Sequence, residues 1–194
     1  PGESLLIMGA AGGVGAAAIE LAKASGVRVI AAVSSEDKAQ FCRDLGADET
    51  IIYSRDMDDR ATQKAFSDEI KKLSGGDGVD VVYDAVGGAY AEPAVRALAW
   101  KGRYLVVGFP AGIPKIPLNL TLLKGSQIMG VFWGAHTARE PKVHAENMAD
   151  LFRMYADGQI KPRISARFPL EKAADALNLM QDRKVQGKVV LDVQ

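Results

Sequence analysis

Cysteine and histidine are scarce in this sequence. Cys42 is the single cysteine among 194 residues, and His136 and His144 are the two histidines. One cysteine excludes a disulfide framework and a zinc site built on several cysteines, and it favours a reducing cytoplasm as the location. We expect both histidines at the surface, and we predict no metal site.

Excess charge and long apolar runs are lacking as well. The 24 Lys and Arg residues balance the 24 Asp and Glu residues, so the formal net charge is zero. A chain without a basic excess has no electrostatic footprint for nucleic acid or for an anionic membrane, so we expect neither as a partner. The alanine-rich run after Gly15 is interrupted by Glu20 and Lys23, well short of the roughly 20 apolar residues of a membrane-spanning helix.

The sequence does contain a regular alternation of short apolar runs with helical stretches. The runs consist largely of Val, Ile and Leu, as is typical of parallel strands that are buried on both faces. Strands are expected at Ser4–Gly9, Arg28–Val33, Glu49–Tyr53, Val79–Asp84, Arg103–Gly108 and Gln127–Trp133, and helices at Gly13–Ala24, Glu36–Gly46, part of Ser54–Lys72 and Ala89–Ala99. This order predicts the α/β class, with a doubly wound, parallel, six-stranded sheet of the Rossmann type.

The pattern changes after Gly134. The expected elements there are a helix from about Arg139 to Ala156, a strand at Ile164–Phe168, a helix at Leu170–Gln181 and a strand at Lys188–Val193. We therefore divide the chain into a dinucleotide-binding Rossmann domain, residues 1–134, and a C-terminal α+β segment, residues 135–194. Two strands are too few for an independent sheet, so we expect them to pair with a domain that precedes residue 1.

Four glycines lie within the seven residues Gly9–Gly15, between an expected strand and an expected helix. Glycine inside an element costs roughly 0.5–1 kcal/mol relative to alanine, so this density needs a reason. Ala10, Gly12 and Gly15 match the A-x-G-x-x-G form of the dinucleotide-binding fingerprint. There the middle position lets a diphosphate approach the backbone, the last lets the helix pack on the strand, and the first N–H groups of the helix hold the phosphates. The alternative is a tight turn that binds nothing.

Two other nucleotide-binding patterns do not fit this stretch. A Walker loop requires Gly-Lys-Ser or Gly-Lys-Thr at its end, but the residue five positions after Gly9 is Val14 and no such lysine follows. The spacing of Gly9, Gly13 and Gly15 also fits short-chain dehydrogenases. Those enzymes use Tyr-x-x-x-Lys, and none of the five tyrosines here has a lysine four residues later.

The residues after the second expected strand indicate which dinucleotide is bound. An enzyme that prefers NAD carries an acidic residue there, which accepts a hydrogen bond from the ribose 2′-hydroxyl. Here Ser34 and Ser35 follow the strand and Lys38 lies one turn into the next helix. Two hydroxyls and an ammonium group suit a 2′-phosphate, so we predict NADP (NADPH). Glu36 and Asp37 would serve a ribose hydroxyl, and a serine would also cap the helix, so NAD remains the alternative.

Six stretches, in this order, carry a resemblance to a known family: GAAGGVG, VSSEDK, LGADETIIY, DVVYDAVGG, GRYLVVGF and LNLTLLKGSQIMGVFWG. The chain resembles, from Pro1 to Gln194, the zinc-independent quinone oxidoreductases of the medium-chain dehydrogenase/reductase superfamily. The resemblance implies hydride transfer from NADPH. It also implies a preceding domain of the chaperonin-10-like type, which supplies much of the substrate cleft and pairs with the C-terminal strands.

The resemblance also implies where the cofactor lies. Residues 11–14 would follow the diphosphate, Ser34, Lys38 and Tyr53 would surround the 2′-phosphate, and the later members of the set would flank the nicotinamide and its ribose. The predicted cofactor-binding residues are Ala10, Ala11, Gly12, Gly13, Val14, Gly15, Ser34, Ser35, Lys38, Tyr53, Val86, Gly108, Phe109, Phe132 and Trp133. Core packing is the alternative for Phe132 and Trp133, and packing on the sheet is the alternative for Tyr53.

The function expected from these features is hydride transfer to a quinone or to an activated enone or enal. No catalytic side chain is evident, because the cofactor carries out the hydride chemistry and the protein positions it. Two alternatives stay open: an enoyl-thioester reductase, including a polyketide synthase reductase module, and a non-catalytic NADPH-binding protein. We expect this chain by itself to bind the cofactor but to turn over little, because much of the substrate pocket lies in the preceding domain.

The last strand of the expected sheet, Gln127–Trp133, is apolar and carries neither a proline nor a charge. In the strand order 3-2-1-4-5-6 it lies at an edge, where unprotected strands tend to pair with other chains. The resemblance implies that a second copy covers it across a two-fold axis. We therefore expect a homodimer built on this strand.

Overall fold

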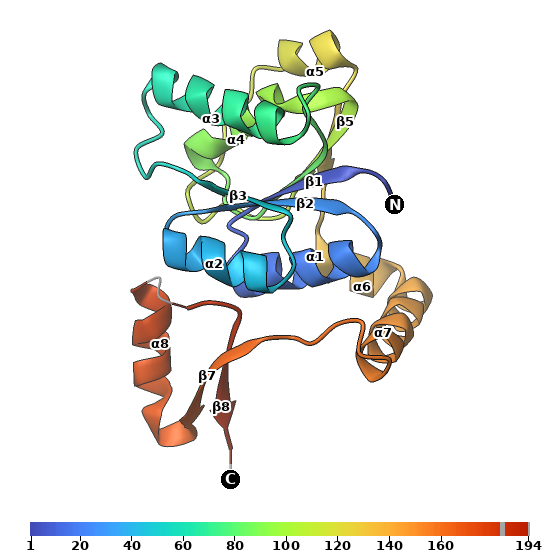
Figure 1. Ribbon diagram of the computed structural model, residues 1–194. Helices are drawn as coiled ribbons and strands as arrows, with labels where there is room; N and C mark the ends of the chain where they lie inside the picture. Colours follow the sequence, from blue (N-terminus) through green and yellow to red (C-terminus); the bar gives the residue numbers. More distant parts are fainter. Residues whose placement is uncertain (183–184, 194) are drawn as a thin grey trace.

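A computed structural model describes residues 1–182 and 185–193. Six parallel strands form one sheet in the order β3-β2-β1-β4-β5-β6 (Figure 1). Their bounds are β1 (Ser4–Met8), β2 (Arg28–Val33), β3 (Glu49–Ile52), β4 (Val79–Asp84), β5 (Leu98–Val106) and β6 (Gln127–Gly130). The predicted doubly wound Rossmann sheet is therefore confirmed. Its strand order reverses between β1 and β4, which is where sheets of this kind bind ligands.

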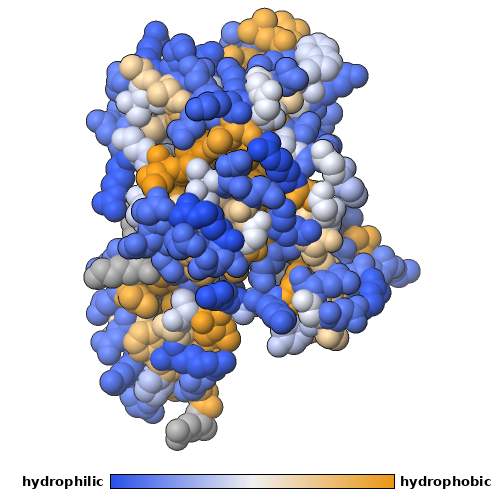
Figure 2. Space-filling model, viewed as in Figure 1, coloured by the Kyte–Doolittle hydropathy of each residue, from blue (hydrophilic) through white to orange (hydrophobic). Residues whose placement is uncertain are grey.

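Helices cover both faces of this sheet (Figure 1). One face carries α1 (Gly13–Ala24) and α2 (Glu36–Asp44), and the other carries α3 (Arg60–Leu73), the 3₁₀ turn η1 (Gly88–Tyr90) and α4 (Ala91–Arg96). A further short helix, α5 (Asn119–Lys124), precedes β6. Leu120 of this helix is buried, whereas Leu122, Leu123 and the N-cap residue Leu118 are 67–81% exposed and form an apolar area of the surface (Figure 2).

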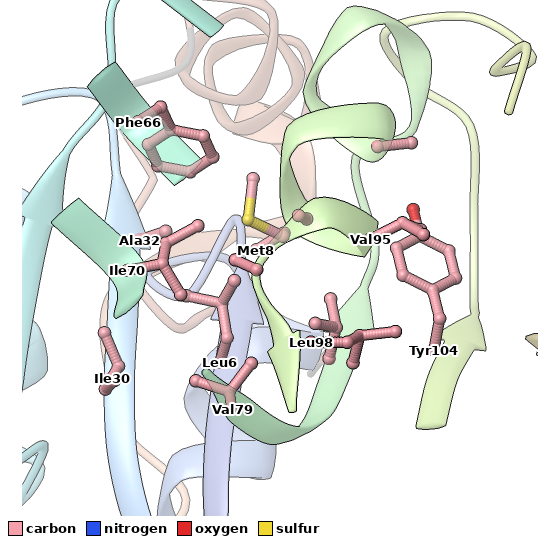
Figure 3. Packing of buried hydrophobic residues seen from close by; sticks show 14 of the residues in the cluster. Leu6, Met8, Ile30, Ala32, Phe66, Ile70, Val79, Val95, Leu98 and Tyr104 are labelled. Atoms are coloured by element: carbon pink, nitrogen blue, oxygen red, sulfur yellow. The ribbon is translucent and has the colours of Figure 1, made fainter. Parts of the chain in front are cut away.

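Each face of the sheet has its own core, because successive side chains of a strand point to opposite faces. Leu6 and Met8 of β1 pack with Phe66 and Ile70 of α3 (Figure 3). Ile7, between them in the sequence, lies on the opposite face in the cluster covered by α1 and α2. Burying a side chain of this size contributes about 1.5–3 kcal/mol, so the central strands and their carboxyl ends are firmly held.

Several element bounds differ from the sequence prediction, and each difference has a local cause. The helix expected from about Arg139 to Ala156 is α7 (Pro141–Ala156), and a helix that was not expected, α6 (Trp133–Arg139), precedes it. Pro141 begins the second helix, and Glu140 before it leaves the helical region at φ −127° and ψ 56°, as residues before proline tend to do. Strand β6 ends at Gly130, not at Trp133, because the chain turns into α6 there.

The C-terminal part consists of β7 (Ile164–Pro169), the 3₁₀ turn η2 (Leu170–Lys172), α8 (Ala173–Gln181) and β8 (Lys188–Asp192). Residues 183–184 and 194 of the predicted segment 135–194 lie outside the described residues. Strands β7 and β8 pair with each other in parallel, and their pairing with a preceding domain stays a prediction. One parallel bridge, between Gly12 and Gly187, joins β8 to the glycine turn of the Rossmann part. Within residues 1–182 and 185–193, no helix is both long and apolar enough to cross a membrane.

Candidate nucleotide-binding cleft

The glycine-rich segment forms a tight turn between β1 and α1. Gly9 takes a left-handed conformation at φ +69°, and its N–H group and that of Ala10 both donate to the carbonyl oxygen of Ala32, at 3.1 and 3.2 Å. Helix α1 begins at Gly13 with Gly12 as its N-cap, and in this described part of the chain neither a capping side chain nor an acidic first-turn residue is present. The first N–H groups of α1 are therefore left for a ligand, with the positive end of the helix dipole behind them.

Two glycines of this turn have different steric roles. A methyl group built on Gly15 would lie 2.6 Å from the Cα atom of Ala10 and 2.6 Å from the carbonyl oxygen of Gly9, so only glycine lets α1 pack this closely on the turn. A methyl group built on Gly12 would have the oxygen of Gly9 as its nearest neighbour, at 3.4 Å, and would point into open space. Gly15 is thus needed for packing, whereas Gly12 leaves room above the backbone.

A cleft of about 660 Å³ opens beside this turn, at the carboxyl ends of β1, β2 and β4. Seven of the residues predicted from the sequence line it: Gly12, Gly13, Val14, Ser34, Lys38, Tyr53 and Val86. These residues come from four separate stretches of the chain, and the sheet topology brings them together at one edge. A cleft at this position is the expected place for a dinucleotide in a doubly wound sheet.

The far end of the cleft is polar and positively charged. The Nζ atom of Lys38 donates to Oγ of Ser34 at 3.4 Å, so the ammonium group and the hydroxyl lie side by side. The ring of Tyr53 packs against Tyr90, with 4.9 Å between the ring centroids, and Arg55 lines the same part of the cleft. Tyr53 therefore both packs on neighbouring aromatic residues and lines the cleft, so the two interpretations of this residue are compatible.

A buried carboxylate shapes the turn that follows β4. One oxygen of Asp84 accepts hydrogen bonds from the backbone N–H groups of Val86 and Gly87, at 2.8 and 2.9 Å. The other oxygen accepts from the hydroxyl of Tyr104. Burial raises the pKa of Tyr104 far above its usual value, and the adjacent Asp84 carboxylate raises it further. Asp84 thus fixes the backbone that carries Val86 into the cleft.

The remaining eight predicted residues are not among those that line the cleft. Ala10, Ala11 and Gly15 are buried beneath the turn, and Ser35 is the N-cap residue of α2. The cleft wall is formed by Pro110 and Ala111, just beyond the predicted Gly108 and Phe109.

Phe132 and Trp133 lie at the start of α6, as its N-cap residue and its first residue. They are 78% and 67% exposed and therefore not buried in a core, so the core-packing interpretation was wrong. The ring of Trp133 meets that of His144 edge to face, with 5.8 Å between the ring centroids. A position flanking the nicotinamide stays a prediction for both residues.

Sequence reasoning missed the wall of the cleft that comes from distant parts of the chain. The additional lining residues are Gly9, Arg55, Ala85, Tyr90, Pro110, Ala111, Met180, Val185, Gly187, Lys188 and Val189. Five of them lie in the C-terminal part, for which the sequence predicts contacts with another domain. No local motif marks them, because only the pairing of the C-terminal segment with the glycine turn brings them to the cleft.

The histidines do not form a metal centre with their neighbours. Nδ1 of His136 lies 3.3 Å from a carboxylate oxygen of Glu140, four residues later on the sequence. Across residues 1–182 and 185–193, no three His, Cys, Asp or Glu side chains lie close enough together to hold a metal ion. The described residues therefore do not fit a zinc ion.

The sequence model of the zinc-binding dehydrogenase family matches residues 13–150. The chain belongs to this family. Among curated relatives, the quinone oxidoreductase-like protein 2 homolog of Nematostella vectensis is 35% identical over 197 residues, which cover 100% of this chain and 52% of that protein. A mycocerosic acid synthase-like polyketide synthase of Mycolicibacterium smegmatis is 32% identical over 99% of this chain and 9% of its own length.

Solved structures give the same assignment within the family. The quinone oxidoreductase of Escherichia coli complexed with NADPH has a TM-score of 0.84 and 29% identity, over 98% of this chain and 57% of that chain. A mycobacterial protein complexed with NADPH has a TM-score of 0.86 and 30% identity, over 98% and 57%. The CurK enoyl reductase has a TM-score of 0.82 and 29% identity, over 100% and 55%. The resemblance to quinone oxidoreductases of the medium-chain superfamily is thus confirmed, and this chain spans about half the length of the quinone oxidoreductase-like relatives.

Proposed function

We propose that this chain is the cofactor-binding part of an NADPH-dependent oxidoreductase that reduces a quinone or an activated enone or enal. The observation that carries the proposal is the cleft itself, which runs from an uncapped helix start at Gly13 to the paired Lys38 and Ser34. A diphosphate fits the first end and a 2′-phosphate fits the second. The two NADPH complexes among the structural neighbours support the same cofactor.

Different residues of the cleft would bind different parts of the cofactor. The N–H groups at the start of α1 would hold the diphosphate, and Lys38, Ser34 and Tyr53 would surround the 2′-phosphate. The turn fixed by Asp84 would place Val86 beside the ribose and ring at the nicotinamide end. NADPH, when bound, supplies the hydride, and the protein supplies position and electrostatics.

The substrate half of the site would come from outside this chain. Hydride transfer requires the acceptor within about 3–3.5 Å of the donor carbon, and such positioning accounts for up to about 7–11 kcal/mol of barrier lowering. We propose that residues 1–134 form the cofactor domain and that residues 135–194 carry contacts to a substrate domain. The exposed apolar side chains of the C-terminal part, Ile164, Leu170, Leu177, Leu191 and Val193, support this assignment. We further propose that the chemistry proceeds without zinc.

A second candidate function is reduction of an enoyl thioester. It is favoured by the polyketide synthase relative and by the structural similarity to the CurK enoyl reductase. Both reactions use the same cofactor cleft, so the residues of this chain do not separate them. A third possibility, binding of NADPH without catalysis, differs from both in giving no turnover.

The test has two parts. Calorimetric titration of this chain with NADPH and NADH examines the cofactor assignment, and NADPH binding no tighter than NADH binding would contradict it. Turnover is then measured for the protein with its preceding domain, on a quinone, an enal and an enoyl-CoA. Reduction of the quinone or the enal supports the first candidate, preference for the enoyl-CoA supports the second, and NADPH binding with no reduction of any acceptor supports the third.

A further inference from the structure

The C-terminal segment closes one side of the cofactor cleft. The N–H group of Gly187 donates to the carbonyl oxygen of Ala11 at 2.9 Å, and Gly187 forms a parallel bridge with Gly12. The side-chain amide of Gln186 donates to the carbonyl oxygen of Asp37 at 3.4 Å, at the start of α2. The segment is therefore attached both to the glycine turn and to the helix that carries Lys38.

The position of the segment is tightly constrained at Gly187. This residue has φ +71°, and a methyl group built on it would lie 2.7 Å from the carbonyl oxygen of Arg163. The next N–H group, that of Lys188, donates to the same oxygen at 2.9 Å. Since Gly187 is fixed between β7 and the glycine turn, the direction in which Lys188 leaves the backbone is fixed as well.

Lys188 lies over the start of α1. A methyl group built on Gly13 would lie 3.5 Å from both Cδ and Cε of Lys188, and Lys188 lines the cleft together with Gly12 and Gly13. The ammonium nitrogen is one bond beyond Cε, so its charge lies beside the first turn of α1. Among the described residues Lys188 forms no ion pair, and no acidic side chain lies in that first turn.

We propose that Lys188 binds the cofactor diphosphate from the side opposite to the N–H groups of α1. An ammonium group and a helix N-terminus that face the same space form a site for an anion with more than one charge. The proposal rests on the proposed function and adds a residue that no local motif identifies. It assigns the diphosphate to Lys188 and the 2′-phosphate to Lys38, and both lysines line the same cleft.

Two small probes separate these assignments. 5′-ADP carries a diphosphate and no 2′-phosphate, whereas 2′-AMP carries a 2′-phosphate and no diphosphate. Both are titrated by calorimetry into the full 194-residue chain and into the variants Lys188→Met and Lys38→Met. Methionine keeps an unbranched apolar side chain and removes the charge, and Lys172→Met, on η2 and outside the cleft, is the matched control.

The expected result is a reciprocal pattern. Lys188→Met weakens the binding of 5′-ADP about tenfold, equivalent to about 1.4 kcal/mol. Its affinity for 2′-AMP stays within twofold of that of the unmodified chain. Lys38→Met weakens 2′-AMP and leaves 5′-ADP within twofold, Lys188→Arg retains most of the 5′-ADP affinity, and Lys172→Met changes neither. NADPH and NADH, which share the diphosphate, lose affinity equally in Lys188→Met.

Three outcomes would overturn the proposal. Unchanged 5′-ADP affinity in Lys188→Met removes the contact, and an equal loss for both probes indicates a general structural role. If the unmodified chain binds neither of the two probes and does not bind NADPH, the proposed function is contradicted as well. If NADPH binds with its predicted preference and only the Lys188 result differs, the proposed function stands and the role of Lys188 falls.

Discussion

Replacement of two glycines in the same turn by alanine should separate folding from cofactor binding. In Gly15→Ala the new methyl group would meet three backbone atoms of Gly9 and Ala10 at 2.6–2.7 Å. Backbone atoms cannot rotate away as a side chain does, so α1 must move off the turn. Overpacking of this kind costs about 1–3 kcal/mol, and the clash is severe enough to place Gly15→Ala at the upper end. The gain in helix propensity from glycine to alanine, about 1 kcal/mol, offsets part of the cost.

The net loss expected for Gly15→Ala is about 2 kcal/mol. For a chain of this size that corresponds to a fall in Tm of about 4–8 °C. Gly12→Ala is the matched control, because its methyl group meets no atom closer than 3.4 Å and the residue already has φ −72°. Its stability should stay within about 0.5 kcal/mol of the parent chain, as for substitutions that disturb no packing. Its NADPH affinity should fall at least tenfold, because the methyl group occupies the space left for the diphosphate.

Urea unfolding and calorimetric titration on the same preparations measure both quantities. A Gly15→Ala chain as stable as the parent would show that the close approach of α1 to the turn is not a packing requirement. A Gly12→Ala chain that binds NADPH as tightly as the parent would remove the diphosphate from the space above Gly12. Either result would refute the separate roles argued for these two glycines.

Three other predictions concern pH, assembly and turnover. The pKa of Tyr104 is raised in the folded chain, so above pH about 10 this tyrosine ionises in the unfolded chain but stays neutral in the folded one. The stability that Tyr104 contributes is therefore complete below pH about 10. Above that pH it falls by up to about 1.4 kcal/mol per pH unit. Urea unfolding between pH 9.5 and 11 should therefore show a smaller loss with pH for Tyr104→Phe than for the parent, and equal slopes would contradict the assignment. The N–H group of Val131 donates to the carbonyl oxygen of Val106, so by alternation along the strand the N–H group of Ile128 points to the open edge of β6. In sedimentation, Ile128→Pro should therefore shift the expected homodimer toward monomer. A parent chain that is monomeric at tens of micromolar would exclude the homodimer. The chain alone should oxidise NADPH with a quinone at near background rate and gain several orders of magnitude with its preceding domain, and equal rates would place the whole catalytic site in this chain.

Local patterns were sufficient to predict the sheet and the nearest part of the site. Strands buried on both faces are continuous apolar runs, and the roles of Gly12 and Gly15 follow from a fingerprint confined to six residues. The pair formed by Ser34 and Lys38 is likewise local, because the two residues are only four positions apart, on either side of the start of α2. These features depend on neighbours in the sequence, so a single chain displays them.

Long-range features could not be predicted in this way. Asp84 looks like the last residue of a strand, and only the fold brings the hydroxyl of Tyr104 to it. Lys188 looks like the first residue of a C-terminal strand, and its place over α1 depends on the pairing of Gly187 with the glycine turn. The start of α7 at Pro141 was the exception, since the proline was visible in the sequence and its helix-starting role was overlooked.

The most direct test of the account is the cofactor preference of the unmodified chain and of its Lys38→Ala variant. Calorimetric titration with NADPH and NADH should give at least tenfold tighter binding of NADPH by the parent. In Lys38→Ala that difference should nearly vanish, because NADPH loses a charge-assisted hydrogen bond worth about 1.5–3 kcal/mol and NADH loses little. A parent chain that binds NADH as tightly as NADPH, or a variant that loses both cofactors equally, would contradict the assignment of the cleft.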